Sequence, residues 1–282
     1  MTFSAAYKLF PPALQTYRVE TACNAPVLCR IPKIQPRKTI DSSPAKNAAD
    51  DMRLSETKRL PAPDFLRTEV TKMPRETDLE RLERMTEYEK ALWAQNVRVA
   101  GMDEVGRGPL AGPVVTACVI VPPDKLVLGV NDSKKVAEKK REKLYALLME
   151  RAEYVRTGWR TPQVIDEINI LAATKAAMEE AAAAAENAHF LVDAVTGLDL
   201  PGPATPIIHG DAISYMIAAA SIIAKVTRDR YMIELDQKYP MYGFARNKGY
   251  GTKEHIEALK KYGPCPEHRR TFIQKFVGEG HE

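Results

Sequence analysis

The chain has 282 residues, 45% of them hydrophobic and 28% charged, which suits one sizeable globular domain with an extension, or two small domains. The formal net charge of +4 permits a nucleic-acid partner without requiring one. No apolar run approaches the roughly 18 residues of a membrane span, and the four widely spaced cysteines predict neither a zinc site nor a disulfide framework.

Residues 1–75 are rich in Pro, Lys, Arg, Ser and Thr and show little periodicity, so we expect a disordered basic extension. It is interpreted as a solvated tail, as a product of an upstream start codon with Met52 or Met73 as later starts, as an arm that touches nucleic acid, or as a transit peptide. Lys8 and Pro11 interrupt the first apolar residues, so a secretory signal is not expected. Together with reduced cysteines, this favours a cytoplasmic location.

Residues 76–96 change in character, because apolar residues recur there at helical spacing between charged ones. These residues are Leu79, Leu82, Met85, Tyr88, Leu92 and Trp93. The pattern predicts one amphipathic helix whose role is packing against the domain that follows, over 97–282.

The rest of the chain predicts an α/β fold. Apolar runs indicate strands at 97–102, 114–121, 154–159, 189–193 and 206–209. Helical patterns occupy 137–151, a pair over 162–188, then 211–239, 253–262 and a tail at 269–276. Strands that come first as neighbours and then alternate with helices are typical of a mixed sheet flanked by helices, here with a C-terminal helical segment.

Acidic residues stand at the ends of these elements. Asp103 and Glu104 follow the first strand, which we expect to end or twist there, since neighbouring strand residues otherwise point to opposite faces. Asp193 closes another strand, at the same edge of the sheet as Asp103. Asp211 begins a helix, where an N-cap is the alternative interpretation. A cluster of carboxylates without soft ligands favours Mg²⁺ or Mn²⁺.

Gly106, Arg107 and Gly108 follow the acids directly. The glycines alone indicate a tight turn, whereas the arginine between them is not required by a turn and suggests a phosphate nearby. Tyr250 lies in a second glycine-containing loop, where packing on the core and a binding role are both open.

Ser221, Lys225 and Arg228 share one face of the 211–239 helix at spacings of four and three. Because the rest of this helix is apolar, the narrow polar face favours contacts to a nucleic-acid backbone, and an ordinary solvated face is the alternative. Contacts of this kind give affinity and salt sensitivity rather than sequence choice. Three histidines, His209, His255 and His268, lack a zinc spacing and predict ordinary hydrogen bonding.

The run from Asp103 to Gly108 resembles the signature of type 2 ribonucleases H, specifically bacterial ribonuclease HII. Segments 132–135, 218–230 and 247–252 are similar to further motifs of that family, so the resemblance covers residue 76 to the C-terminus. It implies a ribonuclease H-like fold. It also implies that Asp103, Glu104, Asp193 and Asp211 are the catalytic carboxylates that hold two Mn²⁺ or Mg²⁺ ions.

The resemblance implies an endonuclease that hydrolyses the RNA strand of RNA–DNA hybrids and cuts 5′ of single ribonucleotides in duplex DNA, leaving 3′-hydroxyl and 5′-phosphate ends. In the family the 106–108 segment reads the 2′-hydroxyl through backbone groups, Tyr250 stacks on the next sugar, and Lys134 approaches phosphate. A monomer without a membrane partner is expected. The tail at 272–282 lacks a glutamine-aromatic motif, so no sliding-clamp partner is expected.

Three alternatives remain at this point. Ribonuclease HIII shares the fold, but it usually differs at the 106–108 segment and carries a structured N-terminal domain. A non-catalytic nucleic-acid-binding protein on a decayed nuclease fold predicts binding without turnover. An enzyme that cleaves small phosphate compounds leaves the basic helix face without a purpose.

Overall fold

In the computed structural model, residues 76–277 are described. The predicted extension over 1–75 lies outside these residues, as does the end of the chain at 278–282. Within the described residues no helix is both long enough and apolar enough to cross a membrane.

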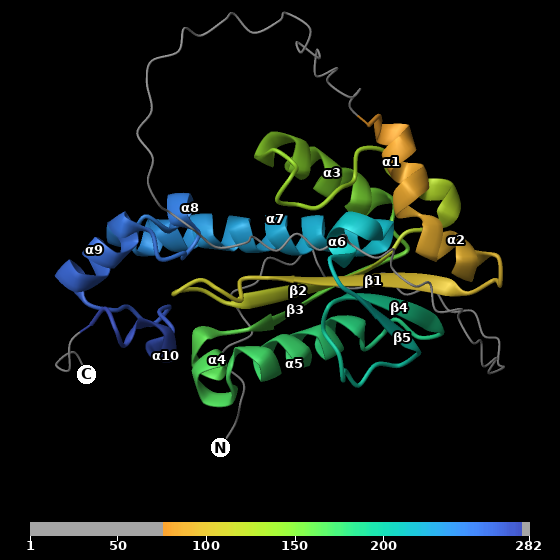
Figure 1. Cartoon of the computed structure of the whole chain (residues 1–282). Coiled ribbons are helices and arrows are strands. Elements are labelled where there is room, and N and C mark those ends of the chain that lie inside the picture. Colours follow the sequence, from red (N-terminus) through yellow and green to blue (C-terminus); the bar gives the residue numbers. More distant parts are fainter. Residues whose placement is uncertain (1–75, 278–282) are drawn as a thin grey trace, which may run out of the picture. The chain divides into compact units, whose positions relative to one another are not determined.

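The centre of the fold is a five-stranded sheet in the order β3-β2-β1-β4-β5 (Figure 1). The strands are β1 Arg98–Val105, β2 Val114–Ile120, β3 Tyr154–Arg160, β4 Ala188–Asp193 and β5 Ala204–Ile207. β1, β2 and β3 pair antiparallel, whereas β4 pairs parallel to both β1 and β5. The predicted mixed sheet is therefore confirmed. Every residue of the apolar strand β2 is buried, as its sequence predicts.

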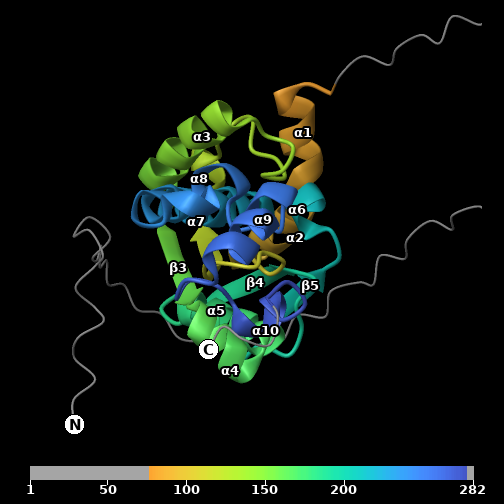
Figure 2. The same ribbon diagram turned by 90° about the vertical axis from the view of Figure 1, so that its left-hand side faces the viewer.

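Helices cover both faces of the sheet (Figure 2). The long helix α7, Tyr215–Lys238, packs on one face, and α3, Glu138–Arg151, lies beside it. The other face is covered by α5, Ile170–Ala182, which follows α4, Pro162–Ile168. Each face has its own apolar cluster, one built from α7 and one from α5, so the sheet separates two cores.

Glycines at the centre of the sheet let both covering helices approach the strands closely. A Cβ atom at Gly101 of β1 would lie 2.0 Å from the main-chain carbon of Met216 in α7. A Cβ atom at Gly158 of β3 would lie 1.9 Å from the carbonyl oxygen of Ala177 in α5. Any side chain at Gly101 would therefore push the start of α7 away from β1.

Strand β1 is longer than predicted. It continues through both acids to Val105, with Asp103 opposite Ala117 and Glu104 opposite Thr116 in β2. The prediction that the strand ends or twists at the acids is wrong, because the antiparallel pairing with β2 holds the strand extended up to the turn at Gly106. The two carboxylates therefore leave opposite faces of the sheet.

Two predicted helices are each divided by a hydroxyl residue. The segment expected as one helix over 76–96 consists of α1, Asp78–Met85, and α2, Glu87–Trp93. The hydroxyl of Thr86, between them, donates to carbonyls of the preceding turn. The helix expected over 211–239 likewise consists of α6, Gly210–Ile213, and α7, with Ser214 extended between them. Both residues offer the backbone a hydrogen-bonding partner outside the helical pattern.

The C-terminal segment packs around the end of α7. It contains α8 Phe244–Asn247, α9 Lys253–Tyr262 and α10 Arg270–Ile273, and it begins with a short 3₁₀ turn at Pro240–Tyr242. Another 3₁₀ turn, Pro123–Lys125, follows β2. An apolar cluster joins this segment to Met232 of α7 and to Ala111 in the loop after β1. An isolated bridge between Ala111 and His268 adds main-chain pairing. The loop after β1 is thereby held between the sheet and the C-terminal helices.

Candidate active site

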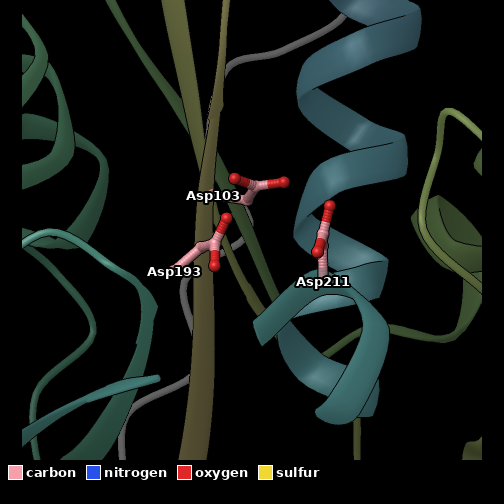
Figure 3. A group of neighbouring side chains, drawn as sticks. All are labelled: Asp103, Asp193 and Asp211. Carbon is pink, nitrogen blue, oxygen red and sulfur yellow. The ribbon is translucent and has the colours of Figure 1, made fainter. Parts of the chain in front are cut away.

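Three carboxylates converge at the carboxyl end of the central strands. Asp103 of β1, Asp193 of β4 and Asp211 of α6 each offer one oxygen within 4.8 Å of the other two. Figure 3 shows the two strand residues side by side and Asp211 facing them from the helical side. Asp103 and Asp211 are buried, whereas Asp193 is partly exposed. The group of carboxylates is therefore reached from solvent at Asp193 and is shielded from water at the other two.

The pairing of the strands explains why Asp103 and Asp193 meet. β1 and β4 run parallel in a register that pairs Met102 with Val192, so each aspartate is the next residue on its strand and both leave the same face. The main-chain N–H of Gly210 donates to Asp193 Oδ1 at 2.8 Å and fixes the start of α6 beside the strand. Asp211 thus lies inside α6, and the alternative that it is the N-cap is wrong, because His209 occupies that position.

Glu104 lies next to this group without joining it. Its side chain leaves the opposite face of β1, and Oε1 accepts a hydrogen bond from Arg107 at 3.3 Å. The second oxygen, Oε2, is buried and has no hydrogen-bond partner among the described residues. The structure therefore brings three of the four predicted acids together and places the fourth at their edge, with one oxygen free to accept a ligand.

The electrostatics of the group favour a bound cation. Burial raises the pKa of Asp103 well above its ordinary value, and the negative charges of Glu104 and Asp193 raise it further. Burial likewise raises the pKa of Asp193 and of Glu104. One cation is close, since Lys134 Nζ lies 3.2 Å from Asp211 Oδ2. An excess of crowded carboxylate oxygens without nitrogen or sulfur ligands suits a hard divalent ion, so the residues present fit such a metal.

The turn at Gly106, Arg107 and Gly108 is held from behind by a buried arginine. Arg269 has no exposed surface, and its guanidinium donates to the carbonyls of Gly106, Arg107 and Gly112 at 2.5–3.0 Å. These carbonyls therefore point into the protein. Arg107 and Gly108 are themselves exposed, so the turn presents its outer side to solvent beside the acids.

Arg228 of α7 is the second buried arginine of this region. It donates to the carbonyls of Pro113, Lys248 and Ala111 at 2.9–3.0 Å and joins the loop after β1 to the loop before Tyr250. Tyr250 is 44% exposed, and a Cβ atom at Gly108 would lie 3.8 Å from its ring. The turn and the tyrosine thus form one exposed surface supported by two internal guanidinium groups.

The predicted polar face of α7 is largely internal. Ser221 is buried, and its hydroxyl accepts from the N–H of Ser133 at 3.2 Å. Lys225 is partly buried and bonds to Asp229 at 2.7 Å. Ser221 and Arg228 are buried because loops cover that side of the helix. Lys134, with 78% of its side chain exposed, remains open to an incoming ligand.

His255 and His268 form a buried pair beneath Tyr250. Their Nε2 atoms lie 3.0 Å apart, while His255 Nδ1 lies 2.9 Å from the carbonyl of Tyr250 and His268 Nδ1 accepts from the N–H of Cys265. These contacts assign one tautomer to each neutral ring. A carbonyl faces His255 Nδ1, which must donate, whereas the N–H of Cys265 and its thiol, at 3.2 Å, face His268 Nδ1, which accepts. The predicted ordinary hydrogen bonding of these two histidines is confirmed.

This pair should make the fold sensitive to acid. Burial, and then the neighbouring His255, lowers the pKa of His268 to about 4. A depressed folded pKa gives stability above the unfolded value near 6.5 that is lost as the pH falls towards 4. We expect the difference in unfolding free energy between wild type and His268→Gln, measured with urea, to fall by about 2 kcal/mol between pH 7 and pH 5. A difference that stays constant over this range would refute the assignment.

Two comparisons of sequence place the chain among known proteins. The family model Ribonuclease HII matches residues 100–276. The ribonuclease HII of Caldanaerobacter subterraneus subsp. tengcongensis is 52% identical over 205 residues, which span 72% of this chain and 85% of that protein. The ribonuclease HII of Enterococcus faecalis is 52% identical over 207 residues, 72% of this chain and 81% of that protein.

Solved structures agree with the sequence comparisons. Ribonuclease H2 of Pyrococcus horikoshii OT3 has a TM-score of 0.55 at 30% identity and covers 64% of this chain and 97% of its own. A PCNA:RNase HII complex from Archaeoglobus fulgidus gives a TM-score of 0.52 at 27% identity, over 61% of this chain and 94% of its own. These similarities confirm the predicted ribonuclease H-like fold.

Proposed function

The chain belongs to the ribonuclease HII family and is a ribonuclease H-type hydrolase, and we propose that it is an endonuclease with two related substrates. It hydrolyses the RNA strand of RNA–DNA hybrids, and it cuts 5′ of single ribonucleotides embedded in duplex DNA, leaving 3′-hydroxyl and 5′-phosphate ends. The observation that carries this proposal is the convergence of Asp103, Asp193 and Asp211 beside an exposed turn and Tyr250.

In this proposal Asp103, Glu104, Asp193 and Asp211 are the catalytic carboxylates and hold two Mg²⁺ or Mn²⁺ ions. When bound, such ions supply an activated water and stabilise the leaving 3′-oxygen. The chain's own contribution is to crowd the carboxylates and keep them desolvated, which makes the group a strong acceptor for divalent cations. Asp103 is central, since the negative charges of the other three carboxylates all raise its pKa.

The remaining predicted residues bind and orient the substrate. The 106–108 turn, with its carbonyls directed inward to Arg269, leaves its outer side to read the 2′-hydroxyl that separates RNA from DNA. Tyr250 stacks on the neighbouring deoxynucleotide sugar, and Lys134 and Lys225 add positive charge near phosphates. Ser221 and Arg228 support these loops from inside.

The proposal also covers the domain boundaries, the cellular location and the oligomeric state of the enzyme. Residues 97–282 form the catalytic domain, 76–96 are a helical segment packed on it, and 1–75 are a basic extension. The protein acts as a cytoplasmic monomer. Ribonuclease HIII, the sister family, is disfavoured by the presence of the Gly106, Arg107 and Gly108 segment.

The test uses an end-labelled DNA duplex with one internal ribonucleotide, in Mg²⁺ or Mn²⁺, with an all-DNA duplex as the control. We expect one cut immediately 5′ of the ribonucleotide and none in the control. Cleavage of a long RNA–DNA hybrid alone would indicate the specificity of the sister family. Binding without cleavage in either metal would overturn the enzyme proposal.

A further inference from the structure

A buried glutamate links α2 to the active-site helices. Glu89 has no exposed surface, and its Oε1 accepts from the hydroxyl of Ser214 at 2.6 Å and from the main-chain N–H of Met216 at 2.9 Å. No salt bridge involves Glu89 within residues 76–277. A buried carboxyl group without a cation is costly unless it serves as a hydrogen-bond acceptor, and here it serves two donors.

The two donors belong to the N-terminus of α7. The first turn of a helix has N–H groups without partners inside the helix. Ser214 is the N-cap and accepts from the N–H of Ile217 at 3.2 Å, while Glu89 accepts from the N–H of Met216 and from Ser214 itself. The cap of α7 is therefore completed by a side chain from a distant helix.

The same junction carries Asp211. Ser214 directly follows α6, so the position of the cap sets where α6 ends. A second contact comes from α1, where Arg84 donates to the carbonyl of Ala212 at 3.1 Å. The third contact is the bond from Gly210 to Asp193 within the site. Beside the bond from Lys134 to Asp211, two of these three contacts at the ends of α6 originate in residues 76–96.

We propose that α1 and α2, which precede the span matched by the family model, are a working part of the active site, with Glu89 as the positioning residue that holds Asp211 against Asp103 and Asp193. This inference rests on the proposed nuclease function. It predicts that the acceptor at residue 89 controls the rate of the chemical step rather than duplex binding, because no contact of Glu89 faces the exposed turn or Tyr250.

The experiment compares Glu89→Leu, which removes the acceptor, with Glu89→Gln, which keeps it, in the full chain. Leu92→Ala is the matched control, since Leu92 is buried in the same helix but its apolar side chain cannot accept hydrogen bonds from Ser214 or Met216. We expect Glu89→Leu to lower kcat on the single-ribonucleotide duplex at least about tenfold with KM within about twofold. Glu89→Gln should stay within about threefold and Leu92→Ala within about twofold of wild type.

Mn²⁺ binding measured by calorimetry gives a readout that does not require cleavage. Glu89→Leu should bind Mn²⁺ at least about fivefold more weakly, and Glu89→Gln about as tightly as wild type. Equal kcat and Mn²⁺ affinity in Glu89→Leu and wild type, or equal losses in Leu92→Ala, would overturn the inference. A wild-type protein that binds Mn²⁺ but cuts neither substrate would instead overturn the proposed function, and the Mn²⁺ affinities would still decide the role of Glu89.

A second pair of variants covers the case in which Glu89→Leu does not fold. Arg84 and Arg81 both pair with Glu76, yet only Arg84 reaches α6. Arg84→Met should lower kcat about threefold, whereas Arg81→Met should leave it unchanged. Equal kcat values for the two variants would contradict the inference, provided that urea unfolding shows both to be folded, since the side chain of Arg84 is 48% exposed and that of Arg81 17%.

Discussion

Replacing Asp103 by Asn should reduce cleavage by about 10³-fold or more while making the metal-free protein more stable. Asp103 is almost fully buried, and this burial, followed by the charges of Glu104 and Asp193, raises its pKa well above the ordinary value. An Asn at this position keeps the shape and can still accept the N–H of Glu104, which lies 2.7 Å from Oδ1. It removes one of the crowded charges, which should add about 1–3 kcal/mol to the free energy of unfolding in EDTA.

The gain in stability should depend on pH in a fixed direction. A carboxyl group with a folded pKa above its unfolded value near 4 contributes stability below that value, and the contribution is lost as the pH rises through the folded pKa. The difference between Asp103→Asn and wild type should therefore widen from near pH 5 to near pH 8, measured by urea unfolding. Asp124→Asn, at an exposed acid of a 3₁₀ turn, is the control and should change neither stability nor cleavage. A destabilised or active Asp103→Asn protein would contradict the central role of this residue.

Replacing Arg269 by Met should cost about 3–5 kcal/mol of unfolding free energy, a large part of the stability of a domain. Methionine fills a similar volume but leaves the inward carbonyls of Gly106, Arg107 and Gly112 without donors. Each buried unsatisfied carbonyl costs about 1–3 kcal/mol. Urea unfolding measures the loss, with Arg270→Met as the control, because Arg270 is the exposed neighbour in the sequence.

The same variant should also lose activity at temperatures where it is folded. Without its inner support the 106–108 turn can rotate its peptide groups, so cleavage at the single ribonucleotide should fall at least about tenfold. The rate on the RNA–DNA hybrid reports whether the loss is confined to reading one 2′-hydroxyl. An Arg269→Met protein within about 1 kcal/mol of wild type would mean that other donors or water satisfy the three carbonyls.

The convergence of Asp103 and Asp193 could be predicted from the sequence because it follows from local rules. Both residues follow apolar runs in the sequence, and the carboxyl ends of parallel neighbours share one edge of the sheet. The face formed by Ser221 and Arg228 could be predicted only in part. Helical spacing states which residues share a face, but the loops that cover that face come from residues near 111, 133 and 248.

The roles of Arg269 and Glu89 could not be predicted, because each depends on contacts between residues far apart in the chain. Arg269 meets the turn more than 150 positions earlier, and nothing in its own neighbourhood signals a buried guanidinium. Glu89 lies in a pattern that continues smoothly as one amphipathic helix. Its partner Ser214 separates α6 from α7, although the helical periodicity of the sequence continues across it. The hydroxyl residues Thr86 and Ser214 were the only local sign that each predicted helix is divided.

The order of the strands also decides when the enzyme becomes competent during its synthesis. β1, β2 and β3 are consecutive and antiparallel, so they can pair as soon as they leave the ribosome. Asp193 on β4 and Asp211 on α6 follow two further helices in the chain. β4 then pairs with β1 on the side that β2 does not occupy. A nascent chain that stops before α6 therefore lacks Asp211, and the acidic group that the proposed hydrolysis requires is incomplete until α6 has been made.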